Sequence, residues 1–265
     1  MRGTALERAF RHDRVVVLGA IGVVTALAWA YVLRLASRMD AAAHDMAMPG
    51  MEMMAPAIAP WAAADFAWMA AMWAAMMVGM MLPSVAPMVL IHAGVARKAL
   101  GQGKPFASTG WFAAGYLLAW TGFALVATAA QMGLERAALL SPTTMATGER
   151  LGGVVLILAG LYQWTPLKER CLAQCQAPLV FLQRHGGFRR DPPGALGLGA
   201  RHGLYCIGCC WALMGLLFVV GVMNVLWIAV IAGFVLLEKV VPAGRALSRV
   251  VGAALVGAGI WMLLG

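Results

Sequence analysis

Long apolar stretches separated by short polar connections make up most of the chain. The first stretch, Val15 to Leu33, has nineteen residues without a charge, which is near the length that crosses a hydrocarbon core of about 30 Å as a helix. A cleaved signal peptide is the alternative, because Ala41 to Ala43 resembles a cleavage site, but this stretch is longer than the usual signal core of about 7 to 15 residues. We therefore expect an uncleaved first span over residues 15–33.

Further apolar stretches predict six more spans. These lie at about 61–91, within 105–134, at 151–167, twice within 203–237 and at 250–265. As one helix, 203–237 would be over about 50 Å long at about 1.5 Å per residue, so we expect two short spans that turn near 221–224. Pro83 and Pro87 are expected to kink or end the second span.

Composition agrees with membrane insertion and disfavours nucleic-acid binding. Hydrophobic residues make up 62% of the chain, charged residues make up 12%, and the mean hydropathy is +0.81, whereas soluble domains carry about 25% charged residues. The net charge of +9 includes no basic stripe interleaved with aromatic residues, which a nucleic-acid groove would need. We predict an all-α, polytopic transmembrane helical bundle of about seven spans, in a single integral membrane domain over residues 1–265.

The distribution of Lys and Arg predicts the orientation of the bundle. These residues collect on cytoplasmic loops of membrane proteins. If the N-terminus is inside, sixteen of the twenty fall on inner segments, and only Arg34, Arg38, Arg136 and Arg150 fall outside. We therefore expect a cytoplasmic N-terminus and a periplasmic C-terminus in a bacterial inner (cytoplasmic) membrane.

All five cysteines fall on the predicted cytoplasmic side, near one membrane level. Cys171 and Cys175 follow one span, and Cys206, Cys209 and Cys210 open the next. Thiols clustered on that side more often bind metal or exchange electrons than form structural disulfides, and an odd number excludes complete pairing within one chain. Four thiolates would suit Zn(II), whereas two or three with added thioethers suit Cu(I). The alternative is that the cysteines are small apolar residues packed in a bundle.

Methionines form a second candidate set of metal ligands. Met69, Met72, Met76 and Met80 are spaced by three, four and four residues, which places them in one stripe on a helix. Thioethers are soft ligands suited to Cu(I), so we name Met72, Met76 and Met80 as candidate ligands. A packing stripe is the alternative, because methionine fills apolar cores well.

The connector at residues 39–60 is rich in methionine and histidine. It contains several prolines, which discourage regular structure, and it is expected on the outer side. A flexible tract of this kind can collect soft metal ions; otherwise it is a tether between two spans.

Several blocks of residues in the core region 61–265 are similar to a known family. In order, they are Trp68 to Pro87, Tyr162-Gln163 through Pro166-Leu167-Lys168 to Cys171 and Cys175, Cys206 through Met214, Met223-Asn224, and Glu238-Lys239. In these blocks the chain resembles the predicted metal-binding integral membrane proteins of bacteria and archaea, an uncharacterised family some of whose members are described as copper chaperones. The resemblance implies metal binding and strengthens the thiol site most. Leucine and serine flank Pro83 where the family often has methionine.

The leading hypothesis is a membrane protein, not an enzyme, that binds a soft transition-metal ion and transfers or transports it. Cu(I) is the expected ion and zinc is the alternative. The expected partners are the ion, the lipid bilayer and a metal-donor or metal-acceptor protein. No ATP-binding loop of the G-x-x-x-x-G-K-[ST] type occurs, so coupling would come from a gradient or a partner. The alternatives are a membrane thiol–disulfide oxidoreductase, which would be an enzyme, and an assembly subunit of a larger membrane complex.

Overall fold

The computed structural model describes residues 5–46, 61–104, 106–141 and 145–265, and within these ranges the regular structure is helical. One isolated bridge, between Leu140 and Thr147, is the exception. The all-α prediction is therefore confirmed for the described chain. Most of the Met/His-rich connector predicted at 39–60 lies outside the described residues, although its first residues continue the first helix to Met46.

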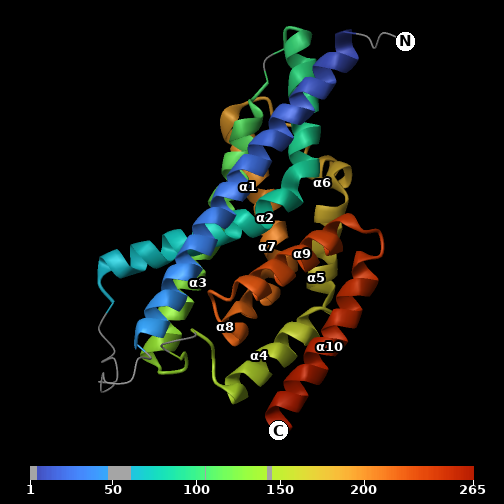
Figure 1. The fold of residues 1–265 in the computed structure, drawn as a ribbon. Helices are drawn as coiled ribbons and strands as arrows, with labels where there is room; N and C mark the ends of the chain where they lie inside the picture. Colours follow the sequence, from blue (N-terminus) through green and yellow to red (C-terminus); the bar gives the residue numbers. More distant parts are fainter. Residues whose placement is uncertain (1–4, 47–60, 105, 142–144) are drawn as a thin grey trace.

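The helices vary widely in length (Figure 1). They are α1 (Ala5–Met46), α2 (Ala63–Gly101), α3 (Thr109–Arg136), α4 (Glu149–Tyr162), α5 (Pro166–Gln176), α6 (Pro178–Arg184), α7 (Pro192–Gly215), α8 (Leu217–Val220), α9 (Val225–Val240) and α10 (Gly244–Leu264).

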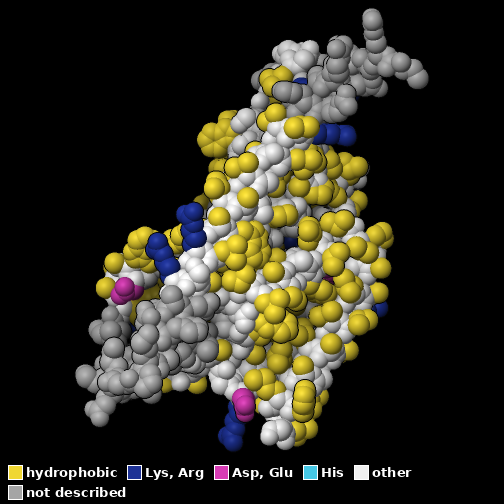
Figure 2. Space-filling model, viewed as in Figure 1, with side chains coloured by type: hydrophobic (Ala, Val, Ile, Leu, Met, Phe, Trp, Pro, Cys, Tyr) yellow, Lys and Arg dark blue, Asp and Glu magenta, His cyan; other side chains and the backbone are white. Residues whose placement is uncertain are grey.

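Five helical segments of the described chain are long and apolar enough to cross a membrane. They are Arg14–Met39, Ala63–Gly101, Thr109–Arg136, Pro192–Val220 and Gly244–Leu264. The other two predicted spans correspond to α4 and α9, with 14 and 16 residues, which reach only about 21 and 24 Å at about 1.5 Å per residue. Hydrophobic side chains are spread over much of the described face in Figure 2, with few charges among them, as expected of a surface that meets lipid.

Both predicted breaks in the apolar helices are present. Helix α8 ends at Val220 and α9 begins at Val225. Gly221 has a φ of +96°, which side chains disfavour, and the Asn224 side chain accepts the Trp227 N–H as an N-cap. Helix α2 continues through its two prolines but changes direction, so that its first half lies across the bundle and its second half rises along it (Figure 1). The prolines kink the helix without ending it.

The prediction that the next span starts near residue 203, with Cys206 at its opening, is wrong. Helix α7 already starts at Pro192, where the Asp191 side chain accepts the Gly194 N–H at 2.8 Å; proline at the first helical position favours this start. Arg201 is exposed and stays on the helix. As a result, Cys206 lies midway along the apolar segment 192–220, and not at its mouth.

Glycines allow α3 and α7 to pack with their backbones in contact. A Cβ atom on Gly199 would lie 2.0 Å from the carbonyl oxygen of Phe112, and one on Gly115 would lie 1.9 Å from that of Leu196. Side chains at these positions would force the helices apart. This close approach places Tyr116 of α3 beside Cys206 of α7.

Candidate metal-binding site

Helices α5 and α7 bring the five cysteines together. We call Cys171, Cys175, Cys206, Cys209 and Cys210 the thiol cluster. Cys171 and Cys175 are four residues apart on α5, and the other three share one face of α7, so the two helices present their thiols to each other. All five are free thiols; Cys175 is half-buried and the others are buried. The structure thus places the five cysteines close together, and their position on the cytoplasmic side of a membrane stays a prediction.

Cys206 is at the centre of the thiol cluster. Its sulfur lies within hydrogen-bonding reach of the thiols of Cys175, Cys209 and Cys210. Its carbonyl oxygen also accepts hydrogen bonds from the Cys209 and Cys210 thiols, each at 3.0 Å. The side chain is 2% exposed, so water does not compete for these contacts.

A lysine ammonium from α9 meets the same sulfur. Lys239 Nζ lies 2.8 Å from Cys206 Sγ, 3.0 Å from Ser84 Oγ and 4.0 Å from Met81 Sδ. The Tyr116 hydroxyl lies 3.1 Å from Cys206 Sγ and donates to the Met81 carbonyl at 3.2 Å. A buried ammonium requires a negatively charged partner, and the Cys206 sulfur can provide it as a thiolate. The thiolate is also the form that binds metals.

The two thiols of α5 differ from Cys206. Burial raises the pKa of the Cys171 thiol, and hydrogen bonds to Cys206 and Cys209 raise the pKa of the Cys175 thiol well above its usual range. At neutral pH these two groups therefore stay protonated. A metal ion that binds them must displace their protons.

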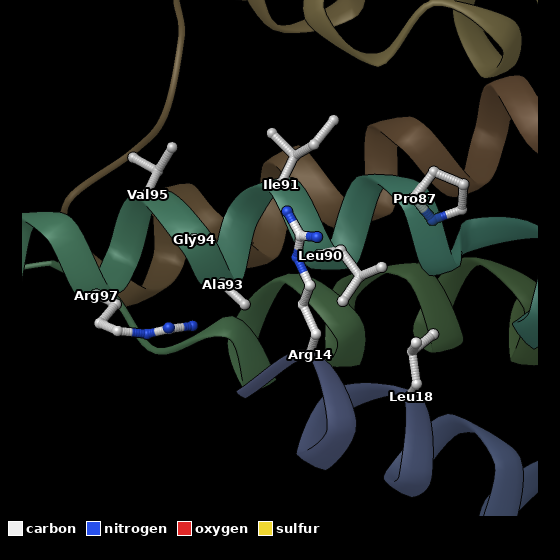
Figure 3. A pocket seen from close by; sticks show the side chains of 9 residues that line it. All are labelled: Arg14, Leu18, Pro87, Leu90, Ile91, Ala93, Gly94, Val95 and Arg97. Carbon is white, nitrogen blue, oxygen red and sulfur yellow. The ribbon is translucent and has the colours of Figure 1, made fainter. Parts of the chain in front are cut away.

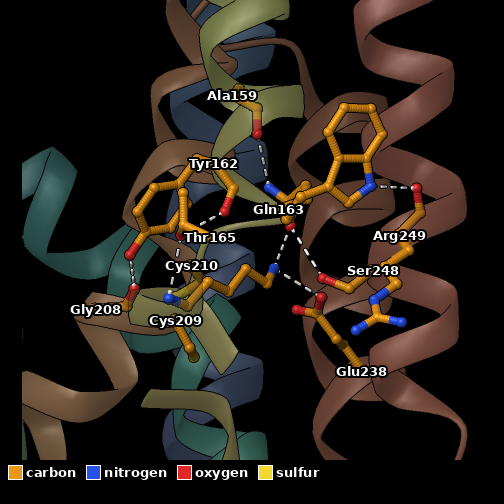
Figure 4. A network of polar contacts seen from close by, with 12 residues as sticks. Ala159, Tyr162, Gln163, Thr165, Gly208, Cys209, Cys210, Glu238, Ser248 and Arg249 are labelled. Atoms are coloured by element: carbon orange, nitrogen blue, oxygen red, sulfur yellow. Dashed lines mark hydrogen bonds and ion pairs between the residues drawn. The ribbon is translucent and has the colours of Figure 1, made fainter. Parts of the chain in front are cut away.

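Close packing fixes α5 against α7 at Gly208. A Cβ atom at this position would lie 2.7 Å from Cys171 Sγ, so only glycine leaves room for the thiol. The Tyr162 hydroxyl donates to the Gly208 carbonyl (Figure 4). This contact connects the end of α4 to the cysteine-bearing turn of α7.

A second polar network lies beside the thiol cluster and connects α4, α5, α9 and α10 (Figure 4). Lys168 Nζ lies 2.7 Å from Glu238 Oε1, and both side chains are fully buried. Lys168 also donates to Gln163 Oε1, which accepts a hydrogen bond from Ser248 Oγ at 3.3 Å. Glu238 and Lys239 are neighbours in sequence, yet one pairs with a lysine and the other with a thiol.

The three candidate methionines are buried in the core, but another methionine lies beside Lys239, next to the thiol cluster. Met72, Met76 and Met80 are 3%, 1% and 2% exposed. Gly79, three residues after Met76 and on the same helix face, packs against Ala28 and Trp29 of α1. The thioether that lies near Lys239 belongs to Met81, the residue after Met80 on α2. The assignment of the three methionines as ligands stays a prediction.

The described residues include no completed metal site. No group of three or more His, Cys, Asp or Glu side chains among them is arranged to hold a metal ion. The thiols instead bond to one another, to backbone carbonyls and to Lys239. Metal binding would require these contacts to be exchanged for bonds to the ion.

A cavity of about 610 Å³ lies elsewhere, between α1 and α2 (Figure 3). Apolar side chains line it together with Arg14 and Arg97, and its lining contains no cysteine or methionine. It is therefore separate from the thiol cluster.

Sequence reasoning missed four residues in or beside the site. Tyr116, Ser84 and Met81 come from α2 and α3, and only the packing of these helices against α7 and α9 reveals their roles. His202 does leave a sequence signal, because it precedes Cys206 by four residues and therefore shares its helix face.

These features define a helical protein with several membrane-crossing segments and a buried site rich in thiols. A family model, PpoB2, described as a copper chaperone, matches residues 70–262, and the chain belongs to this family. The match covers all five cysteines and confirms the resemblance to a family with copper-chaperone members. No curated protein and no solved structure gives a significant match. Membership points to a copper-related, non-enzymatic function.

Proposed function

We propose that the chain is a single-domain, seven-span protein of the bacterial inner membrane that receives Cu(I) and hands it on. In this proposal α4 and α9 complete the seven spans, with the N-terminus in the cytoplasm and the C-terminus in the periplasm. Membership of a copper chaperone family supports the cargo. The observation that carries the proposal is Cys206, a buried sulfur in contact with three other thiols and one ammonium.

The donor set of the thiol cluster suits Cu(I). Thiolates and thioethers prefer this soft ion over harder cations. Cys206 is the primary ligand. An ion bound to it is within reach of Cys175, Cys209 and Cys210, whereas Cys171 lies at the edge of the cluster. Cu(I) and the Lys239 ammonium each carry one positive charge, so arrival of the ion replaces one cation by another at the same sulfur. The buried charge of the site then changes little.

Transfer follows from exchange between successive soft ligands. The outer Met/His-rich connector at 39–60 captures the ion, and Met72, Met76 and Met80 relay it towards the thiol cluster. Each exchange replaces one sulfur by another, so no single site holds the ion too tightly to release it. A donor protein outside and an acceptor protein inside would complete the path.

The copper content of the purified protein tests this proposal directly. The full-length protein is purified in detergent under reducing, anaerobic conditions, loaded with Cu(I) and washed. We expect the wild type to retain stoichiometric copper and Cys206→Ser to lose most of it. The matched control is Tyr116→Phe, which removes another group in contact with the Cys206 sulfur but no candidate ligand, and it should keep its copper. Equal copper in the wild type and folded Cys206→Ser would contradict the assignment.

A further inference from the structure

His202 is a buried histidine with an unused ring nitrogen. Its side chain is 4% exposed, and Nδ1 has no hydrogen-bond partner among the described residues. An unsatisfied buried polar atom costs about 1 to 3 kcal/mol, so native proteins seldom keep one without a reason. A ligand that binds this nitrogen would provide the missing partner.

Cys206 is the neighbour that connects this imidazole to the copper site. The two residues are four apart on α7, where side chains on one face have Cβ atoms about 5 to 6 Å apart. They interact electrostatically. Tyr116 contacts both, since its hydroxyl lies 3.1 Å from Cys206 Sγ and its ring centroid lies 6.1 Å from that of His202.

Aromatic side chains enclose the imidazole on its other sides. The His202 ring centroid lies 4.9 Å from that of Phe181 and 6.0 Å from that of Phe112. These rings offer no hydrogen-bond acceptor to the imidazole and exclude water. The only metal-ligating side chain near His202 on its own helix face is therefore the Cys206 thiol.

We propose that His202 is a further Cu(I) ligand, which binds the ion together with Cys206 and then accepts it on the way out of the thiol cluster. This inference rests on the proposed function. His202 lies one turn, about 6 Å, from Cys206 towards Pro192, the end of α7 that follows Arg189 and Arg190 in the chain. The ion stays Cu(I) throughout: a copper–nitrogen bond forms as copper–sulfur bonds to the cluster break.

The chemistry of the pair favours release. Imidazole binds copper, but thiolates hold Cu(I) more firmly, so a mixed site is weaker than the thiol cluster. Beyond His202 the Phe181 ring separates it from His185, whose ring centroid is 4.4 Å from that of Phe181. His185 is half-buried and lines a cavity of about 260 Å³ at the start of α7. An ion on His202 is thus one side chain away from this cavity.

His92 provides a matched control for His202. It is fully buried, its Nε2 also has no hydrogen-bond partner among the described residues, and its ring stacks on Phe112 with the centroids 5.3 Å apart. Its Nδ1 lies 3.2 Å from Thr109 Oγ1, and His92 has no hydrogen bond with a thiol of the described residues. The two histidines share burial and an unused nitrogen and differ in their nearness to Cys206.

X-ray absorption at the copper edge tests the assignment on the full-length, Cu(I)-loaded protein. We expect sulfur and imidazole scattering in the wild type, the same spectrum in His92→Gln, and loss of the imidazole contribution in His202→Gln. The His202→Met variant should keep its copper with sulfur ligands only. If His202→Gln does not fold, the His202→Met spectrum decides the question alone.

Different results would overturn the role of His202 and the proposed function. Imidazole scattering that persists without His202, or a wild-type spectrum with sulfur alone, overturns the role of His202 and leaves copper binding through Cys206 in place. A folded wild type that binds no copper overturns both.

Discussion

The buried ion pair between Lys168 and Glu238 allows a quantitative test of how the site is held together. The two charged atoms are 2.7 Å apart, and the side chains are 1% and 0% exposed. At that distance the attraction is about 6 kcal/mol with an effective dielectric constant of about 20, and loss of hydration offsets much of it. Removing one partner leaves the other charge buried and alone, which costs about 3 to 5 kcal/mol.

A second ion pair of equal length gives the matched control. Arg249 Nη2 also lies 2.7 Å from Glu169 Oε1, but these side chains are 64% and 36% exposed. Exposed pairs contribute only about 0.2 to 1 kcal/mol. We therefore expect Glu238→Gln to lower the free energy of unfolding by several times more than Glu169→Gln does.

Denaturant titration of each variant in detergent, followed by tryptophan fluorescence, measures the difference. The double variant Lys168→Met with Glu238→Leu removes both charges and should recover most of the stability lost in Glu238→Gln, because no unpaired charge remains. Equal destabilisation by Glu238→Gln and Glu169→Gln would refute the reasoning, since burial would then not control the strength of the pair. A double variant less stable than Glu238→Gln would refute it as well.

Two further predictions concern glycines that position the thiol cluster. Gly199→Ala places its Cβ atom 2.0 Å from the carbonyl oxygen of Phe112, a backbone atom that can move only with its helix. We therefore expect a loss of about 1 to 3 kcal/mol in unfolding free energy and weaker copper retention. The control Gly197→Ala, with nothing within 4 Å of its Cβ atom, should leave stability and copper retention unchanged or slightly improved. Gly208→Ala presses on Cys171 Sγ at 2.7 Å and should lower the melting temperature, and adding Cys171→Ala should restore most of it. If the added alanine brings no recovery, the contact with the thiol is not the cause.

Much of the fold follows from local sequence. Apolar length and proline position depend only on neighbours along the chain. For the described residues they correctly predicted helical structure, several helices long and apolar enough to cross a membrane, and a kink in α2. The break near Gly221 also follows locally, because a glycine with positive φ and an asparagine N-cap stop one helix and start the next. That the two cysteine groups could meet followed from chain order, because one connection joins the helices that carry them. That Cys206 lies midway along its apolar segment did not follow from the sequence pattern.

The contacts that give the site its chemistry could not be predicted in this way. Lys239 and Tyr116 reach Cys206 from two other helices, and Met81 contacts both of these residues from α2. The distance between α3 and α7 depends on residues such as Gly199, whose packing partner Phe112 is far away in sequence. Met80 and Met81 are adjacent in sequence and therefore lie on different faces of α2. The spacing of the methionines does not show which of these faces meets Lys239.

The sequence by itself therefore determined the class of protein and the candidate soft ligands, because apolar length and residue chemistry are local properties. Only the tertiary structure decided that Lys168, Glu238 and Lys239 are buried, and that Nδ1 of His202 has no hydrogen-bond partner within the described part of the chain. Burial and pairing depend on which helices meet and how closely, and these are set by packing across the whole bundle.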